Sequence, residues 1–383
     1  QLFFVPAHCR AAPPFLEHST VAMAGLPNLA PLFALSEASA SVVSATCGWP
    51  LTALTEQGGT AGAIADFSRR VLLAESSLHV QLVEVLLLAL MWRAVFSKIR
   101  SSVLRLEDRP WFEKAVLRTQ EALKKSAGVH VDLTEAARSY ANSPALASQH
   151  IVGGLLCLPA LFRVLPLDMR SALTRHGALS EVAWEIMDVC ETVHKRWIRP
   201  GGARGREEVP NICLVISFSH HIMATTMVMP VNLFYSDARG YVALVFGLQI
   251  AAGLSLAISA YVFSLDLKVP SQLFQMQAMA VVQVVICLLL RGVLFVVATF
   301  NLVCLFHRDQ ATVFLALSLP AVLGMSLMNF ILIYDSWCRM RKFLRWAPEK
   351  QQAQEAAAPA PAAAAAAARG RRLSAASMAA VEL

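Results

Sequence analysis

Charge is scarce in this chain. Lys, Arg, Asp and Glu together make up 15% of its 383 residues, whereas hydrophobic residues make up 56%, and the mean hydropathy is +0.54. Soluble domains carry about 25% charged and about 45–50% apolar residues. The shortage of charge therefore argues against a soluble globular domain. Because the apolar residues gather in runs of about 20, the composition predicts a polytopic membrane protein.

Familiar chemical motifs are also missing. The sequence contains no P-loop, no Ser nucleophile elbow and no H-E-x-x-H motif, and its eight cysteines form no C-x-x-C pair. A single His doublet, with His150, His176, His194 and His307 isolated along the chain, does not provide the several His clusters that membrane hydroxylases need. We therefore expect no metal and no cofactor. We also expect no nucleic-acid partner, because membrane topology accounts for the basic residues.

The apolar runs predict an all-α bundle of about seven membrane helices. The third run is the least hydrophobic and has to be shielded by its neighbours. The sixth run exceeds the roughly 20 residues that a span needs. We expect it to be strongly tilted, extended beyond the membrane, or broken near Arg291. The predicted spans are about 79–96, 148–167, 177–195, 210–233, 240–264, 272–306 and 311–337.

The positions of the basic residues orient these helices. The loop 98–142 holds nine Lys and Arg residues, and further clusters follow the third span (195–206) and the seventh (339–345). Seven spans place all three clusters on one side of the membrane. The positive-inside rule then predicts a lumenal or outside N-terminus and a cytosolic C-terminus.

The remaining segments give the domain organisation. Residues 1–77 are rich in Ala, Ser, Pro and Gly and predict a poorly ordered lead-in, and the chain begins with Gln1, so we expect a fragment, a processed form or an incomplete gene model. The first transmembrane helix occupies 78–97. A basic cytosolic loop over 98–144 carries an amphipathic interfacial helix at about 111–125. A six-helix membrane domain covers 145–345, and an Ala-rich tail over 346–383 is expected to be disordered.

Two successive predicted spans carry the polar residues of most interest. His220 and His221 lie inside the fourth span, and an intramembrane imidazole is costly enough to indicate a functional site. Glu181, Glu185 and Asp188 of the third span lie at i, i+4 and i+7, on one helical face. Neighbouring side chains on a helix diverge by about 100°, so one His would act as base or ligand while the other caps a polar group. The alternative is that both histidines only hydrogen-bond between helices.

Arg291 lies deep in the sixth apolar run, with Gln283 and Cys287 on about the same face. A buried guanidinium needs a partner. The carboxylates of the third span or an anionic lipid headgroup would provide one. The alternative is an ion pair between helices that only fixes their packing.

These residues resemble the TLC family (the TRAM, Lag1 and CLN8 homology family) over roughly 145–345. The resemblance is carried by H-H-I-M-A-T-T-M from His220, the following Arg239-Gly240, the acidic stretch from Arg175 to Asp188, Arg291, and the last span from Asn329 to Lys342. It implies a helix bundle around a lipid-accessible cavity, in the endoplasmic reticulum, with membrane lipids as partners. The implied lipid-binding residues are Glu181, Glu185, Asp188, His220, His221, Gln249 and Arg291.

The best-known members of that family are ceramide synthases, which acylate a long-chain base with acyl-CoA. In that branch, acidic residues and a further His follow the doublet, whereas the corresponding stretch 247–253 here contains neither, and Gln249 cannot act as a general base. We therefore expect a protein that binds, senses or regulates sphingolipid or phospholipid, without ceramide synthase activity. An acyltransferase with His220 or His221 as the catalytic base is the first alternative. A seven-helix receptor is the second.

Overall fold

The computed structural model describes residues 77–127, 131–198 and 209–345. These segments form helices and short connections, without a strand among them. The expected lead-in over 1–76 and the expected tail over 346–383 lie outside the described residues.

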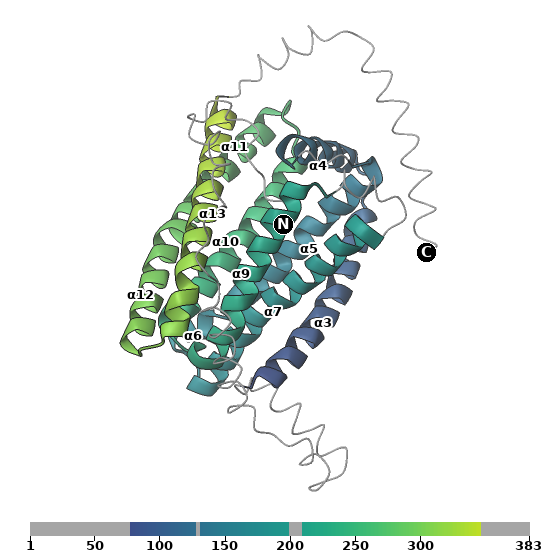
Figure 1. Ribbon diagram of the computed structural model, residues 1–383. Helices are drawn as coiled ribbons and strands as arrows, with labels where there is room; N and C mark the ends of the chain where they lie inside the picture. Colours follow the sequence, from purple (N-terminus) through teal and green to yellow (C-terminus); the bar gives the residue numbers. More distant parts are fainter. Residues whose placement is uncertain (1–76, 128–130, 199–208, 346–383) are drawn as a thin grey trace, which may run out of the picture.

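Long helices run side by side between the two ends of a bundle, and each reverses the direction of the one before it (Figure 1). They are α3 (Leu78–Leu104), α5 (Leu133–Leu155), α7 (Leu167–Val193), α9 (Asn211–Tyr235), α10 (Arg239–Ser264), a rod made of α11 (Pro270–Ile286), the π-helix η4 (Cys287–Leu294) and α12 (Phe295–Arg308), and α13 (Thr312–Leu344). Three shorter elements complete the fold: α4 (Pro110–Ala127), α6 (Leu158–Phe162) and η3 (His194–Ile198).

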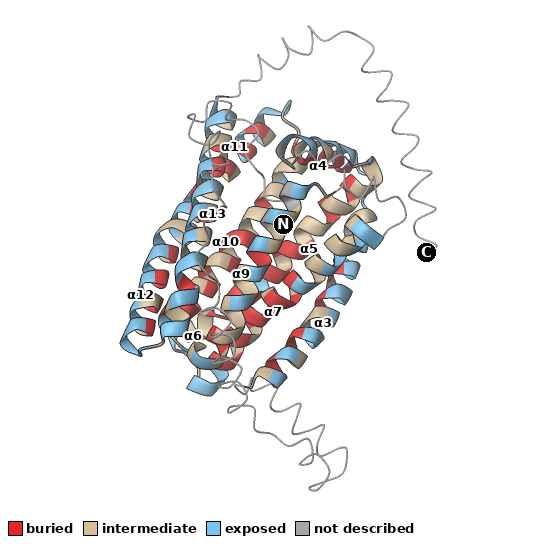
Figure 2. Ribbon diagram, viewed as in Figure 1, coloured by how far each residue is buried: buried red, intermediate tan, exposed pale blue. Residues whose placement is uncertain are grey.

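The outer surface of the bundle is apolar. By length and composition, five described segments can cross a membrane: Leu78–Leu104, Leu133–Phe162, Arg239–Ser264, Pro270–Arg308 and Thr312–Leu344. Large side chains such as Leu86, Phe300 and Leu323 are exposed on α3, α12 and α13, while buried residues concentrate in α5, α7 and α10 (Figure 2). A surface of this kind is stable against lipid, so the chain is a multi-pass membrane helical protein.

Two predicted boundaries are wrong because polar sequence hides helix. The stretch 98–142 is largely helical: α3 continues to Leu104, α4 follows, and α5 begins at Leu133 behind the N-cap Asp132, whose side chain accepts a hydrogen bond from the Glu135 amide. The second predicted span therefore begins at 133 rather than at 148, and ends at Phe162. Helix α7, which contains the third predicted span, begins at Leu167 rather than near 177, directly after Pro166.

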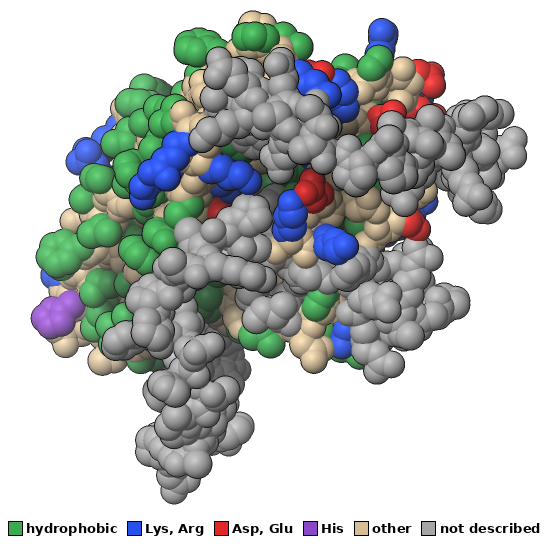
Figure 3. Space-filling model, turned by 90° about the horizontal axis from the view of Figure 1, so that it is seen from above, with side chains coloured by type: hydrophobic (Ala, Val, Ile, Leu, Met, Phe, Trp, Pro, Cys, Tyr) green, Lys and Arg blue, Asp and Glu red, His purple; other side chains and the backbone are tan. Residues whose placement is uncertain are grey.

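A helix, α4, lies where the amphipathic interfacial helix was expected over 111–125, at one end of the bundle (Figure 1). Its apolar face, including Phe112 and Val116, is buried against Tyr140 of α5 and Phe263 of α10. Arg118 donates a hydrogen bond to the Phe263 carbonyl oxygen at 3.1 Å. Helix α4 is therefore docked on protein. Viewed from this end, the bundle shows several Lys and Arg side chains on its surface (Figure 3).

Glycines bring α5, α7 and α10 close together. A Cβ atom built at Gly177 of α7 would overlap the carbonyl oxygen of Gly153 in α5. A Cβ atom built at Gly153 would overlap the side-chain amide oxygen of Gln249 in α10. Small residues allow membrane helices to approach in this way. The close packing fixes the three helices that carry much of the polar residue cluster described below.

The long sixth run forms one continuous rod, and its irregularity is a change of hydrogen-bonding pattern. Between Cys287 and Leu294 the rod is π-helical, and Arg291 lies within that stretch. The irregularity expected near Arg291 therefore takes the form of a π segment. Such segments often occur at functional sites, where they redirect side chains.

Candidate functional site

A cavity of about 160 Å³ lies between α7, α9, α10, the η4–α12 rod and α13. Most of its wall is apolar, with four methionines, Met223, Met227, Met325 and Met328, among the lining residues. The lining residues that are charged or carry an imidazole or amide come from four of these elements and from α5: His150, Glu181, Glu185, His220, Gln249 and Arg291. The cavity therefore combines a charged or polar region with a hydrophobic one.

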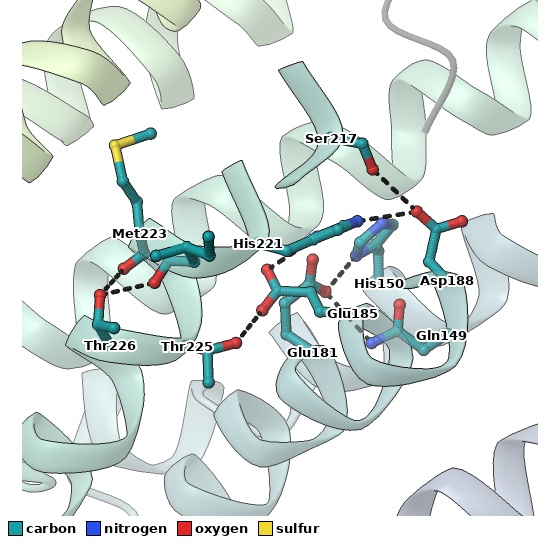
Figure 4. A network of polar contacts seen from close by, with 11 residues as sticks. Gln149, His150, Glu181, Glu185, Asp188, Ser217, His221, Met223, Thr225 and Thr226 are labelled. Carbon is teal, nitrogen blue, oxygen red and sulfur yellow. Dashed lines mark hydrogen bonds and ion pairs between the residues drawn. The ribbon is translucent and has the colours of Figure 1, made fainter. Parts of the chain in front are cut away.

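Three acidic residues of α7, Glu181, Glu185 and Asp188, point toward α5 and α9 (Figure 4). Glu181 Oε2 lies 2.8 Å from His150 Nδ1 and 3.3 Å from Gln149 Nε2, both on α5. Glu185 Oε2 accepts a hydrogen bond from the Thr225 hydroxyl of α9 at 3.0 Å. One face of α7 thus joins two neighbouring helices through carboxylates.

Asp188 completes this face one turn further along. Its Oδ2 atom accepts a 3.2 Å hydrogen bond from the Ser217 hydroxyl and lies 2.8 Å from His221 Nε2. The other ring nitrogen of His221, Nδ1, lies 3.8 Å from Glu185 Oε1. His221 is therefore placed between two carboxylates.

The two histidines of α9 have different surroundings. His220 lines the cavity, whereas His221 is not among the lining residues and is bound by Asp188. Their ring centroids are nevertheless only 5.5 Å apart, and a ligand atom from each lies within 4.8 Å of the other and of a Glu185 oxygen. Adjacent side chains diverge around a helix, and these two imidazoles still lie close enough for one ligand atom of each to be near Glu185.

Two of the histidines treated as isolated in the sequence are partnered in the fold. His150 is 1% exposed and pairs with Glu181, and His176 pairs with Glu84 of α3. His150 and Gln149 are the site residues that sequence reasoning missed. The signal was present: both lie inside a predicted span, where the cost of an imidazole applies as it does to His220.

Gln249 of α10 and Arg291 of η4 also line the cavity. The Gln249 side chain donates a 2.9 Å hydrogen bond to the Gly177 carbonyl oxygen, which fixes its amide against α7. Arg291 Nη1 donates a 3.0 Å hydrogen bond to Asn329 Oδ1 of α13. The expected partners of Arg291 were the carboxylates of α7 or an anionic lipid headgroup, and its hydrogen-bond partner in the structure is Asn329. Arg291, Glu181 and Glu185 line the same cavity.

This arrangement can hold a polar group and exchange protons with it. A His oriented by a carboxylate, as His221 is by Asp188, is the usual construction of a general base or of a fixed hydrogen-bond donor. His220, which faces the cavity, is the imidazole that a bound molecule would meet. The arrangement therefore suits recognition of an amphiphile whose polar end reaches the acidic face of α7.

Comparisons with known protein families, curated proteins and solved structures find no match to this chain. The class is consequently defined by the fold alone: a multi-pass membrane protein built from α-helices, with a polar cluster inside its bundle.

Proposed function

We propose that this TLC-like protein binds a membrane lipid in the cavity and thereby senses or regulates sphingolipid or phospholipid levels. The observation that carries the proposal is the cavity itself, in which one region is polar and the rest is hydrophobic. Ligand sites typically combine an apolar wall with a few polar groups that fix orientation. A lipid with a hydrogen-bonding headgroup matches both parts.

The position of α13 supports entry from the membrane. This helix contributes Ser318, Ala321, Val322, Met325 and Met328 to the cavity wall. Of the most apolar 18-residue stretch of this helix only 11% is buried inside the protein, so most of the helix faces outward. One wall of the cavity is thus a helix in contact with lipid, and a lipid needs to displace little protein to reach the polar residues.

The same proposal includes seven spans, with α7 and α9 crossing beside the five apolar segments. Helix α7 has 27 residues and α9 has 25. At about 1.5 Å per residue both exceed the roughly 30 Å of a hydrocarbon core. Their polar side chains face each other and α5, which explains how α7, with its carboxylates, fits inside a membrane bundle. The basic end of the bundle then faces the cytosol, with the N-terminus in the lumen of the endoplasmic reticulum.

Photo-crosslinking tests the binding proposal. Membranes containing the protein are incubated with a clickable, photoactivatable long-chain base or phosphatidylcholine, irradiated, and digested for mass spectrometry. Crosslinks are expected on α9 and α13 peptides that contain Met223 or Met325. They should be lost in the His220→Ala/His221→Ala variant, which still inserts because its span becomes more hydrophobic. Crosslinks spread evenly over outer faces, or unchanged in the variant, would contradict binding in the cavity.

Acyl transfer from acyl-CoA is the second candidate, and the pair of His221 and Asp188 favours it. The carboxylate that orients the imidazole comes from α7 rather than from the stretch around Gln249, so the missing acids of that stretch have a possible substitute. A turnover assay with long-chain base and acyl-CoA on the same purified samples separates the candidates. N-acylated product that disappears in Asp188→Asn supports the transferase, and lipid binding without product supports the sensor.

A further inference from the structure

Three buried side chains converge at one edge of the cavity. Glu185 is 1% exposed, His221 4% and His220 9%, and each offers a ligand atom within 4.8 Å of the other two. The sequence separates Glu185 from the His doublet by a whole connection between helices, so only the fold brings them together. Neither the lipid proposal nor the acyl-transfer candidate requires this particular convergence.

The orientation of His221 leaves one nitrogen turned toward Glu185. Its Nε2 atom lies at hydrogen-bond distance from Asp188, whereas Nδ1 and Glu185 Oε1 are 3.8 Å apart, and neither of these two atoms has a hydrogen-bond partner. When Nδ1 carries no proton, two buried acceptors face each other at this distance, and a cation between them would offset the cost of burying both. A separation of 3.8 Å is too long for a hydrogen bond but close to the spacing of two ligands on one metal ion.

The surroundings resemble those of metal ligands. A ligating His usually donates its other ring N–H to a carboxylate, and Asp188 occupies that position for His221. A ligating carboxylate is usually held by a hydrogen bond, and the Thr225 hydroxyl provides one to Glu185 Oε2. Figure 4 shows Asp188 and Glu185 at opposite sides of the His221 ring.

We propose that Glu185, His220 and His221 bind a divalent transition-metal ion, with Zn²⁺ the best match. Two imidazoles and one carboxylate suit zinc and also iron(II), whereas calcium and magnesium prefer oxygen ligands alone. Glu185 and His220 both line the cavity, so an ion held by them has a side that is open to a bound molecule. The alternative occupant of the same space is a proton, which would make His221 an imidazolium held between two carboxylates.

Elemental analysis distinguishes the metal from the proton. The full chain, purified in detergent with a tag that does not bind metals, should carry about one zinc or iron per chain by inductively coupled plasma mass spectrometry. Glu185→Gln and His221→Ala should lower that content at least tenfold. Glu84→Gln is the matched control, because it removes a buried carboxylate that pairs with His176 outside the cavity, and it should retain the metal.

Asp188→Asn separates ligation from support. Loss of an outer carboxylate typically lowers metal affinity roughly 10–100-fold without removing the site. The variant should therefore bind Zn²⁺ with that reduced affinity in a competition titration, whereas Glu185→Gln should show no saturable binding.

A stability assay covers the case in which a ligand variant does not fold. Zn²⁺ added back to chelator-treated wild-type protein should raise its unfolding temperature, because a ligand bound only by the folded state stabilises it. Protein that carries no metal after purification and shows no saturable uptake of Zn²⁺ or Fe²⁺ would overturn the proposal. Metal retained in both Glu185→Gln and His221→Ala would overturn it as well. None of these measurements uses lipid, so their failure is distinct from a failure of lipid binding.

Discussion

Substitution of Gly177 by Ala tests whether the site depends on close contact between α5 and α7. The added methyl group would overlap the Gly153 carbonyl oxygen, which is backbone and cannot rotate away. Overpacking a tight core typically costs about 1–3 kcal/mol. Any shift of α7 also strains the hydrogen bond from Gln249 to the Gly177 carbonyl, at a cost of about 1 kcal/mol. The higher helix propensity of Ala returns about 1 kcal/mol, so the net loss is about 1–3 kcal/mol.

Gly292→Ala is the matched control for that substitution. A Cβ atom there would meet the Ile333 side chain at 3.6 Å, which is ordinary van der Waals contact. The control should be neutral or slightly stabilising, by at most about 1 kcal/mol. Both variants are compared with the wild type by thermal unfolding in one detergent, followed by tryptophan fluorescence. Equal midpoints for Gly177→Ala and the wild type would refute the close packing of α5 against α7.

Further predictions concern stability, pH and topology. Trp92 donates a buried 2.6 Å hydrogen bond to the Ser180 hydroxyl, so Trp92→Phe should lower the free energy of unfolding by about 1 kcal/mol. Trp197→Phe, at an exposed position, should leave it unchanged, and thermal unfolding checks both variants. The hydrogen bond from Lys114 holds the pKa of Asp266 below its ordinary value of 3.8. The stability that this carboxylate contributes is therefore present above pH 3.8 and is lost as the pH falls through the lower folded value. The protection factors of the α4 amides against hydrogen exchange should fall on acidification in the wild type. This pH step should be absent in Asp266→Asn. A tag at the C-terminus should be accessible to antibody when only the plasma membrane is permeabilised, and staining that appears only after the internal membranes are opened would contradict a cytosolic C-terminus.

The helical class and the amphipathic helix α4 were predictable because both rest on local pattern. A run of about 20 apolar residues indicates a membrane helix whatever its neighbours are. Apolar residues that recur at helical spacing among charged ones define the buried face of α4. Helix boundaries were less predictable. The first ten residues of α7 include Asp168, Arg170 and Arg175, which hydropathy reads as a loop although they continue the helix.

The partners inside the site were not predictable from spacing alone. The i, i+4, i+7 pattern placed Glu181, Glu185 and Asp188 on one face, and the structure has that face directed at two helices. Which helix each carboxylate contacts depends on how closely α5 and α7 approach at Gly153 and Gly177. That close approach places His150 next to Glu181. Arg291 shows the same limit, because its partner Asn329 lies on a helix whose rotation only the packing determines.

Native mass spectrometry of the purified protein, with the cavity filled by mutation, tests the central claim most directly. Ala321 of α13 lines the cavity, and Leu323 on the same helix is 70% exposed on the outer surface. The wild type and Leu323→Trp should carry a bound lipid that survives release from the detergent micelle, and Ala321→Trp should not, because its indole occupies the cavity. Lipid retained equally by all three proteins, or by none of them, would contradict the account of a lipid-binding cavity.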